Sequence, residues 1–83
     1  MSEIQITIVA FGIARDIIGG NSMKLNLEEG STASSAMAIL KEKYPDFEKL
    51  NSLKLAINEE YVDDHQFIHA NDELVLIPPV SGG

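Results

Sequence analysis

The two most apolar stretches of this chain lie near its opposite ends, at residues 4–11 and 74–77. Both are rich in β-branched or aliphatic side chains, a composition that indicates strands buried on both faces. A chain of 83 residues forms one domain, so two buried strands must share the centre of one sheet. We therefore expect them to lie side by side and parallel, joined by a right-handed crossover.

Two further segments show the alternation of strands. Residues 23–28 alternate apolar with polar side chains, as in a strand with one solvated face, and should pair antiparallel with residues 4–11. Residues 53–57 repeat this alternation, and a turn at 58–60 leads to a short strand at 61–62. The sequence therefore predicts a sheet of four to five strands.

One main helix is predicted between these strands. Ser31 or Thr32 supplies a hydroxyl cap for its first turn, and Pro45 ends it. The helix has one apolar face, formed by Ala33, Ala36, Met37, Leu40 and Tyr44. Residues 12–20 are interpreted as a connection with a short helical option, and residues 63–72 as a polar loop.

This order of elements predicts an α+β fold of the ubiquitin-like β-grasp class, a mixed sheet with the main helix packed across it. The folded domain should cover residues 1–77. Residues 78–83 should form an extended, flexible tail, because Pro78 and Pro79 lack the N–H groups that continue a sheet.

The composition excludes several classes of partner and site. Thirteen acidic residues against six basic ones give a net charge of −7, which is unsuited to nucleic acid or an anionic membrane surface. A protein partner with a basic surface is favoured, although solubility alone also explains the charge. The chain has no cysteine, so thiolate metal sites are excluded. It shows no signal peptide and no apolar run near the roughly 20 residues of a membrane helix, so we expect a cytoplasmic protein.

The last six residues, Pro-Pro-Val-Ser-Gly-Gly, carry the clearest functional signal. The prolines favour an extended exit, and Gly82 and Gly83 can enter a channel too narrow for side chains. The reactive group at the tip is the α-carboxylate of Gly83. A free carboxylate is a poor electrophile, but an acyl-adenylate is a good one, and a sulfur nucleophile would convert it to a thiocarboxylate. The tail therefore predicts a chain that works through an activated Gly83, and a thiocarboxylate formed there could donate its sulfur elsewhere.

Three stretches together resemble a known family. Residues 11–19 (FGIARDIIG) resemble its aromatic–x–x–x–Arg–acid–x–x–Gly segment, residues 56–62 (AINEEYV) its Val-Asn-x-x-Tyr-Val hairpin, and residues 71–83 (NDELVLIPPVSGG) its C-terminal signature. The sequence is similar in these stretches to the ubiquitin-like sulfur carriers, and among them to the small subunit of molybdopterin synthase.

The resemblance implies a sulfur-donating subunit without an active site of its own. Gly83 would be adenylated by an activating enzyme that uses ATP, converted to a thiocarboxylate, and would give its sulfur to cyclic pyranopterin monophosphate in molybdenum cofactor biosynthesis. The implied partners are this activating enzyme and the large synthase subunit, in a heterotetramer of two large and two small subunits. The chain itself should bind no cofactor. The tail residues expected to enter the partners are Pro78, Pro79, Val80, Ser81 and Gly82.

Some residues outside the tail are weaker candidates. His65 and His69 have the spacing of paired ligands on a helix, but they lie in a predicted loop without a third ligand, so no metal site is expected. Glu59 and Glu60 belong to an acidic group that a solvated hairpin explains as well as a docking contact does. The candidate docking residues of the domain are Phe11, Arg15, Glu59 and Glu60.

Two other functions stay open at this point. The chain could carry sulfur for another pathway, such as synthesis of the thiamine thiazole, although such carriers are usually shorter and lack the Pro-Pro-Val-Ser segment. It could also be a ubiquitin-like modifier that forms isopeptide bonds from Gly83 to protein lysines. Conjugates of higher mass that survive denaturing gels would favour the modifier.

Overall fold

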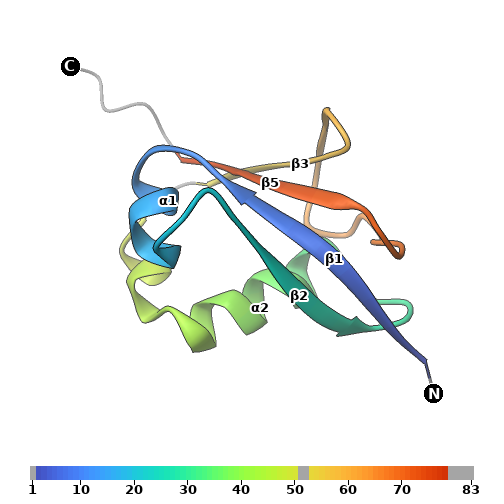
Figure 1. The fold of residues 1–83 in the computed structure, drawn as a ribbon. Helices are drawn as coiled ribbons and strands as arrows, with labels where there is room; N and C mark the ends of the chain where they lie inside the picture. Colours follow the sequence, from blue (N-terminus) through green and yellow to red (C-terminus); the bar gives the residue numbers. More distant parts are fainter. Residues whose placement is uncertain (1, 51–52, 79–83) are drawn as a thin grey trace.

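The computed structural model describes residues 2–50 and 53–78, and Figure 1 shows its ribbon. Five strands form one sheet in the order β2-β1-β5-β3-β4, with helices packed against it. The elements are β1 (Glu3–Ala10), α1 (Gly12–Ile18), β2 (Ser22–Glu28), α2 (Ala33–Lys43), the 3-10 helix η1 (Pro45–Lys49), β3 (Lys54–Ile57), β4 (Glu60–Val62) and β5 (Glu73–Ile77).

The pairing of the strands confirms the predicted topology. β1 pairs antiparallel with β2 and parallel with β5, so the first and last strands lie side by side. β3 pairs antiparallel with both β5 and β4. The crossover between the two parallel strands contains α2, which lies across the sheet (Figure 1). The sheet is therefore mixed, as the order of apolar segments predicts.

The core lies between one face of the sheet and α2. Ile6, Ile8, Leu74 and Leu76 line that face, and each is at most 1 % exposed. Leu40 of α2 is fully buried against them. Removing a buried side chain of this size typically destabilises a domain by about 2–5 kcal/mol. These five positions therefore supply much of the free energy that holds the sheet against the helix.

The predicted helix forms with the predicted boundaries. The Thr32 hydroxyl accepts a hydrogen bond from the Ser35 N–H at 3.3 Å, so Thr32 rather than Ser31 is the cap. The last helical residue is Lys43, directly before Tyr44 and Pro45. Pro45 then opens η1, which carries Phe47 into the core. The cap and the proline are local signals, and for that reason the sequence predicts both ends.

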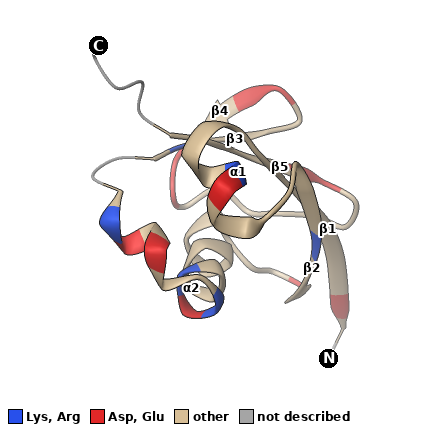
Figure 2. Ribbon diagram, turned by 60° about the vertical axis from the view of Figure 1, so that its left-hand side comes forward, with Lys and Arg blue, Asp and Glu red and all other residues tan. Residues whose placement is uncertain are grey.

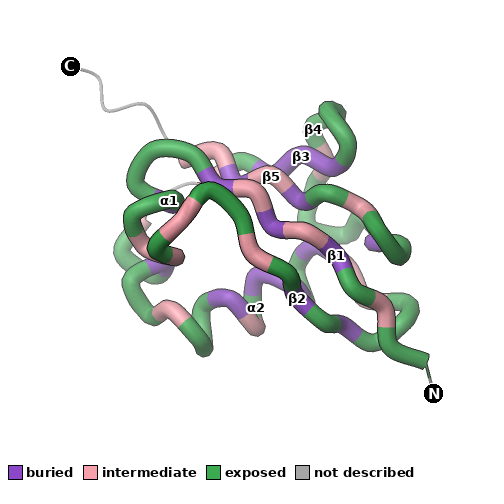
Figure 3. Tube along the Cα trace, in the orientation of Figure 1, coloured by how far each residue is buried: buried purple, intermediate pink, exposed green. Residues whose placement is uncertain are grey.

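One prediction about the central strands is wrong. Both were expected to be buried on both faces, but Val9 and Val75, which point away from the core, are only half-buried. Both helices pack on the same face of the sheet, so its other face stays open (Figure 1). The tube in Figure 3 shows the result, with buried and half-buried residues alternating along β1 and β5.

Two segments that look irregular in the sequence have more structure than expected. Residues 12–20 contain a helix of seven residues, α1, closed by Gly19 in a left-handed conformation. In the predicted loop 63–72, Ile68 is 1 % exposed. The carbonyls of Gln66 and Asp64 in this loop accept the N–H groups of Ala33 and Ser34. The loop thus satisfies donors in the first turn of α2 that the helix itself leaves free.

Candidate functional site

β5, the strand that leads to the tail, lies at the centre of the sheet. It pairs with β1 from Glu73 to Leu76 and with β3 from Leu74 to Ile77. Neighbours on both sides satisfy its backbone, and the side chains of Leu74 and Leu76 are fully buried. The chain therefore reaches Pro78 from the interior of the sheet rather than from an edge. The start of the tail has a fixed place in the fold.

Pro78 lies against the turn that begins α1. Gly12, the first residue of this helix, has a φ of +54°. A Cβ atom on Gly12 would lie 3.2 Å from Cγ of Pro78, which is tighter than an ordinary van der Waals contact. The half-buried Pro78 ring thus lies directly over backbone at this turn.

The open face of the sheet carries a row of apolar side chains near the tail. The strand register pairs Val9 with Val75, Val75 with Ala56, and Ala56 with Tyr61. Residues paired in this way lie on the same face of a sheet, so the four form one row across β1, β5, β3 and β4. Tyr61 is 72 % exposed, Val9 and Val75 are half-buried, and Ala56 between them is buried at 6 % exposure. We call Val9, Val75, Ala56 and Tyr61 the apolar row.

The four predicted docking residues divide between two ends of the molecule. Phe11 is the N-cap of α1 and Arg15 lies in the last turn of this short helix, and the Phe11 side chain is 55 % exposed. Glu59 and Glu60 lie at the tip of the β3–β4 hairpin. Because Ile57 pairs with Leu74 while Lys54 pairs with Ile77, this tip is at the opposite end of β5 from Pro78. Only Phe11 and Arg15 lie at the tail end; Figure 2 colours the acidic residues of the hairpin red.

The comparisons with known proteins agree with this geometry. A family model described as the ThiS family matches residues 8–83. A relative named molybdopterin synthase sulfur carrier subunit, from Arabidopsis thaliana, is 37% identical over 83 residues, covering 99% of this chain and 86% of its own length. This chain belongs to the ThiS family.

Solved structures place this ThiS-family chain among ubiquitin-like folds. SAMP1 from Haloferax volcanii has a TM-score of 0.83 at 23% identity, over 95% of this chain and 99% of its own. A ubiquitin of Caldiarchaeum subterraneum has a TM-score of 0.66 at 20% identity, over 99% and 100%. The chain also matches, at TM-score 0.67 and 25% identity over 96% and 100%, a complex of subunits 1 and 2 of molybdopterin-converting factor from Helicobacter pylori. The predicted β-grasp fold is confirmed.

The tail of this ThiS-family chain lies mostly outside the described residues. Pro78 is described, whereas the predicted tail residues Pro79, Val80, Ser81, Gly82 and Gly83 are not. The match to the family model nevertheless includes them, since it extends to residue 83. The role of Gly83 therefore rests on sequence similarity and on where the fold places Pro78.

The two histidines are exposed and lie on the loop between β4 and β5. Nδ1 of His69 is 3.9 Å from a carboxylate oxygen of Asp72. Over residues 2–50 and 53–78 there is no group of three or more potential ligands that could hold a metal ion. Over the same ranges no helix has the length and apolar character needed to span a membrane.

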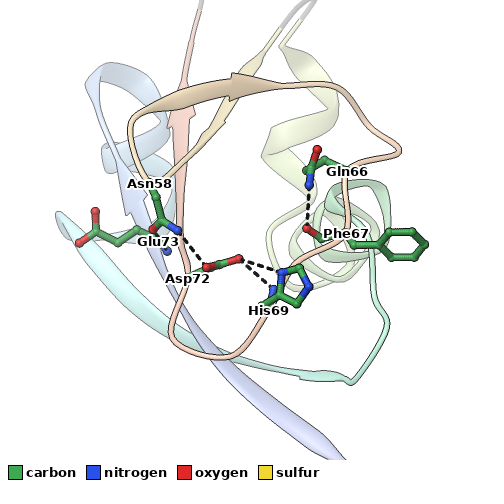
Figure 4. A network of polar contacts seen from close by, with 6 residues as sticks. All are labelled: Asn58, Gln66, Phe67, His69, Asp72 and Glu73. Carbon is green, nitrogen blue, oxygen red and sulfur yellow. Dashed lines mark hydrogen bonds and ion pairs between the residues drawn. The ribbon is translucent and has the colours of Figure 1, made fainter.

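The sequence analysis missed a polar network at the end of β5 opposite the tail (Figure 4). The Asn58 side chain donates to Oδ1 of Asp72 at 2.9 Å and accepts from the Glu73 N–H at 3.1 Å. Oδ2 of Asp72 accepts the His69 N–H at 2.8 Å. This network ties the β3–β4 turn to the segment that enters β5. Asn58 at the start of a turn was the one signal in the sequence that could have indicated it.

Proposed function

We propose that this chain is the sulfur carrier subunit of molybdopterin synthase. The observation that carries the proposal is the similarity to relatives of that name along almost the whole chain, 37% over 99% of it. The fold supports the proposal, because a compact domain brings the chain to Pro78 at a fixed point and the last residues are Gly82 and Gly83. In this proposal the folded domain positions the tail, and the α-carboxylate of Gly83 is the group that reacts.

The chemistry takes place at the α-carboxylate of Gly83. In the first step a carboxylate oxygen attacks the α-phosphate of ATP, pyrophosphate leaves, and an acyl-adenylate forms. In the second step a hydrosulfide equivalent from a donor attacks the acyl carbon and AMP leaves, which gives the thiocarboxylate. ATP belongs to the activating enzyme, and this chain supplies only the carboxylate. Each thiocarboxylate then gives one sulfur to cyclic pyranopterin monophosphate, and the acyl group left on Gly83 takes up water and returns to the carboxylate. Two such transfers supply the two sulfurs of the molybdopterin dithiolene.

The length and composition of the tail suit transfer inside a partner. Six extended residues span at most about 20 Å, which is enough to reach a buried site from the surface of the domain. Gly82 and Gly83 carry no side chains, so they fit a narrow channel and allow close approach of backbone. We propose that Pro78, Pro79, Val80, Ser81 and Gly82 enter each partner in turn.

Two partners follow from this chemistry, an adenylating enzyme and the large synthase subunit. The Helicobacter pylori neighbour is a complex of two molybdopterin-converting factor subunits, which supports a large-subunit partner for this chain. We propose a heterotetramer of two large and two small subunits. The net charge of −7 suits partners with basic surfaces and would repel a phosphorylated pterin, so the pterin pocket belongs to the large subunit. The cytoplasmic location stays a prediction.

The surface near the tail carries apolar and aromatic side chains that we propose these partners contact. The apolar row, Val9, Val75, Ala56 and Tyr61, lies on the face that no helix covers, and Phe11 is exposed beside α1. Exposed aromatic side chains are enriched at protein interfaces. We propose that Phe11 and Arg15 contact the partner that receives the tail. Glu59 and Glu60, at the far end, would act mainly on the rate of encounter through their charge.

Intact-protein mass spectrometry tests the proposal. The chain is incubated with ATP, a sulfur donor and a molybdopterin-pathway activating enzyme. We expect a mass increase equal to one oxygen replaced by sulfur, and none for a variant that lacks Gly83. A shift only with a thiazole-pathway enzyme would assign the chain to that pathway. Stable conjugates of higher mass would indicate a protein modifier instead.

A further inference from the structure

β2 is an edge strand whose outer side has no partner among the described residues. It pairs with β1 alone, and the sheet ends there (Figure 1). Its core-facing side chains, Met23, Leu25 and Leu27, alternate with the exposed Lys24 and Asn26. The strand is seven residues long and contains no proline. A long, regular edge of this kind is able to accept a further strand.

The outward backbone groups in the middle of β2 belong to Lys24 and Asn26. Directly before the strand, the Ala10 N–H donates to the Asn21 carbonyl at 2.9 Å. Hydrogen-bonded pairs alternate with non-bonded pairs in an antiparallel ladder, so the odd-numbered residues of β2 bond to β1 and the even-numbered residues face away from it. Lys24 and Asn26 therefore present their N–H and C=O groups to the outside of the sheet.

A hollow of about 340 Å³ lies along this edge, between β2 and α2. The half-buried side chains of Met23 and Ile39 form its apolar part, and the exposed Lys24 and Lys43 are its charged residues. No carboxylate of the described residues lines it, although the chain has thirteen acidic residues against six basic ones. The hollow is therefore a basic and apolar region on an acidic protein.

Lys24 does not shield the edge. A lysine on an edge strand commonly prevents pairing with another chain, but Nζ of Lys24 donates to the Thr7 hydroxyl at 2.8 Å, across the β1–β2 pair. The side chain therefore lies back over the open face of the sheet rather than over the outward backbone groups. A further strand, about 4.8 Å from β2, would have Lys24 on one side and Lys43 of α2 on the other.

We propose that the edge of β2 binds an extended segment of a partner protein, rich in acidic and apolar residues, which adds to the sheet as a further strand. Backbone hydrogen bonds to Lys24 and Asn26 hold the segment. Successive side chains of a strand point to opposite faces, so apolar groups contact Met23 and Ile39 while carboxylates meet Lys24. Gly83 takes no part in this binding, so the inference goes beyond the proposed function and does not depend on it.

A second copy of this chain suits the edge less well. Pairing of two β2 strands would bring the lysines of both copies close together, and like charges across a strand pair are destabilising. An acidic segment is attracted by Lys24 and Lys43 instead. Acidic groups of the chain farther away than about 8 Å are largely screened at physiological ionic strength. The charges at the hollow therefore favour an acidic segment.

The first test measures amide hydrogen exchange of the full chain by NMR, with and without a capped peptide of four Glu-Val repeats. With the peptide bound, exchange at Lys24 and Asn26 should slow at least about tenfold. The amides of Met23 and Leu25, which already bond to β1, should change little. A peptide of four Lys-Val repeats, with the same pattern and the opposite charge, should bind at least about tenfold more weakly.

Three outcomes of this test would overturn the proposal. The first is protection confined to another surface, such as the apolar row. The second is equal binding of the two peptides. The third is protection of Lys24 and Asn26 that needs no peptide and rises with the concentration of the chain, which would assign the edge to a second copy.

The second test reverses one charge at the hollow. Lys43→Glu should weaken binding of the Glu-Val peptide about tenfold, because Lys43 lines the hollow beside β2. Lys41→Glu is the matched control, since Lys41 also lies in the last turn of α2 but lines a different hollow, next to Phe47. Equal effects of the two variants would mean that net charge, rather than this site, attracts the peptide, against the proposal.

The third test removes a backbone donor. Asn26→Pro deletes an outward N–H at an edge position where proline is tolerated, so binding should be lost, whereas Asn26→Ala keeps the N–H and should bind normally. N-methylation of the peptide covers the case in which Asn26→Pro folds poorly, because it leaves the protein unaltered. Methyl groups on the glutamate nitrogens or on the valine nitrogens should abolish binding in one set only, since alternate residues of an added strand face β2. Equal effects of the two sets would contradict strand addition.

Discussion

The two ends of β5 are held in different ways. At the Glu73 end, Asn58, Asp72 and His69 form directional hydrogen bonds between 2.8 and 3.1 Å. At the Ile77 end, the Pro78 ring occupies the space where a Cβ of residue 12 would lie, with Cγ 3.2 Å from that position, and its nitrogen can donate no hydrogen bond. One end is fixed by polar groups that specify both distance and angle. At the other end the strand pairing reaches Ile77, and Pro78 beyond it is placed by the shape of the turn that begins α1.

The Glu73 end of β5 therefore stabilises the fold, whereas the Ile77 end leads to the tail that is proposed to react. The hydrogen bonds at the Glu73 end join the β3–β4 turn to β5. We assign them to the stability of the fold rather than to partner binding. At the Ile77 end the strand passes directly into Pro78, the start of the tail proposed to carry the sulfur. Substitutions at the Glu73 end should therefore lower stability and leave sulfur transfer unchanged. Substitutions in the tail should lower sulfur transfer and leave stability unchanged.

Removing Gly83 is the strongest test of this separation. We expect the variant to lose all sulfur loading, because the next residue presents its carboxylate one position short of the reacting group. Stability should not change, because the buried residues of the described part all lie between Ile6 and Leu76. Intact mass after loading and a thermal melt measure the two properties. Gly82→Leu should behave in the same way. A melting temperature that falls together with loading would contradict the separation.

Asn58→Ala should have the reverse effect. The substitution removes two side-chain hydrogen bonds, each contributing about 0.5–1.5 kcal/mol, and places alanine at a φ of +50°. We expect a loss of roughly 2–3 kcal/mol in the free energy of unfolding, or on the order of 10 °C in melting temperature. Sulfur loading of the folded protein should be normal.

A matched asparagine provides the control for this variant. Asn26 lies on the exposed edge strand β2 and takes part in one long side-chain contact, 3.3 Å to Gln5. Asn26→Ala should change stability by no more than about 0.5 kcal/mol, as most surface substitutions do. Equal losses in Asn26→Ala and Asn58→Ala, measured by denaturant unfolding, would show that the network at the Glu73 end has no special role.

Glu59→Gly should stabilise the domain. Asn58 and Glu59 form the two-residue loop between the paired residues Ile57 and Glu60, and both have positive φ, +50° and +78°. Such loops favour Asn-Gly, so glycine removes strain at position 59. After allowing for the greater freedom of glycine in the unfolded chain, we expect a gain of about 0.5–1 kcal/mol. Glu60→Gly, in a strand, should instead lose about as much. Equal effects of the two variants would contradict this account of the turn.

Features with a sequence period or a local marker were predictable. The alternation in residues 23–28 located β2, and Thr32 and Pro45 marked the ends of α2. The open face of the sheet was missed, because a strand with one half-buried apolar face has the same composition as one buried on both. Ile68 was missed because a single apolar residue in a polar loop shows no period.

The candidate site was predictable only where it is local in sequence. The roles of Gly82 and Gly83 were predicted from the ending itself and stay predictions. The apolar row combines residues from four strands, and the Gly12–Pro78 contact joins residues near opposite ends of the chain. Pairs of this kind depend on the register of the sheet, which hydrophobic pattern alone does not fix to the residue.

His69→Ala is expected to have the smallest effect, because the His69 side chain adds little to the polar network at the Glu73 end of β5. Its contact with Asp72 in the network uses the backbone N–H, which alanine keeps. The ring is 79% exposed and lies 3.9 Å from the carboxylate, and exposed ion pairs contribute at most about 1 kcal/mol. We therefore expect melting temperature and sulfur loading to stay close to those of the wild type. Added zinc should not raise the melting temperature of either protein, because a ligand that binds the folded state would do so. A rise in the wild type that His69→Ala abolishes would show that the loop holds a metal, against the prediction that His65 and His69 bind none because they lie in a loop without a third ligand.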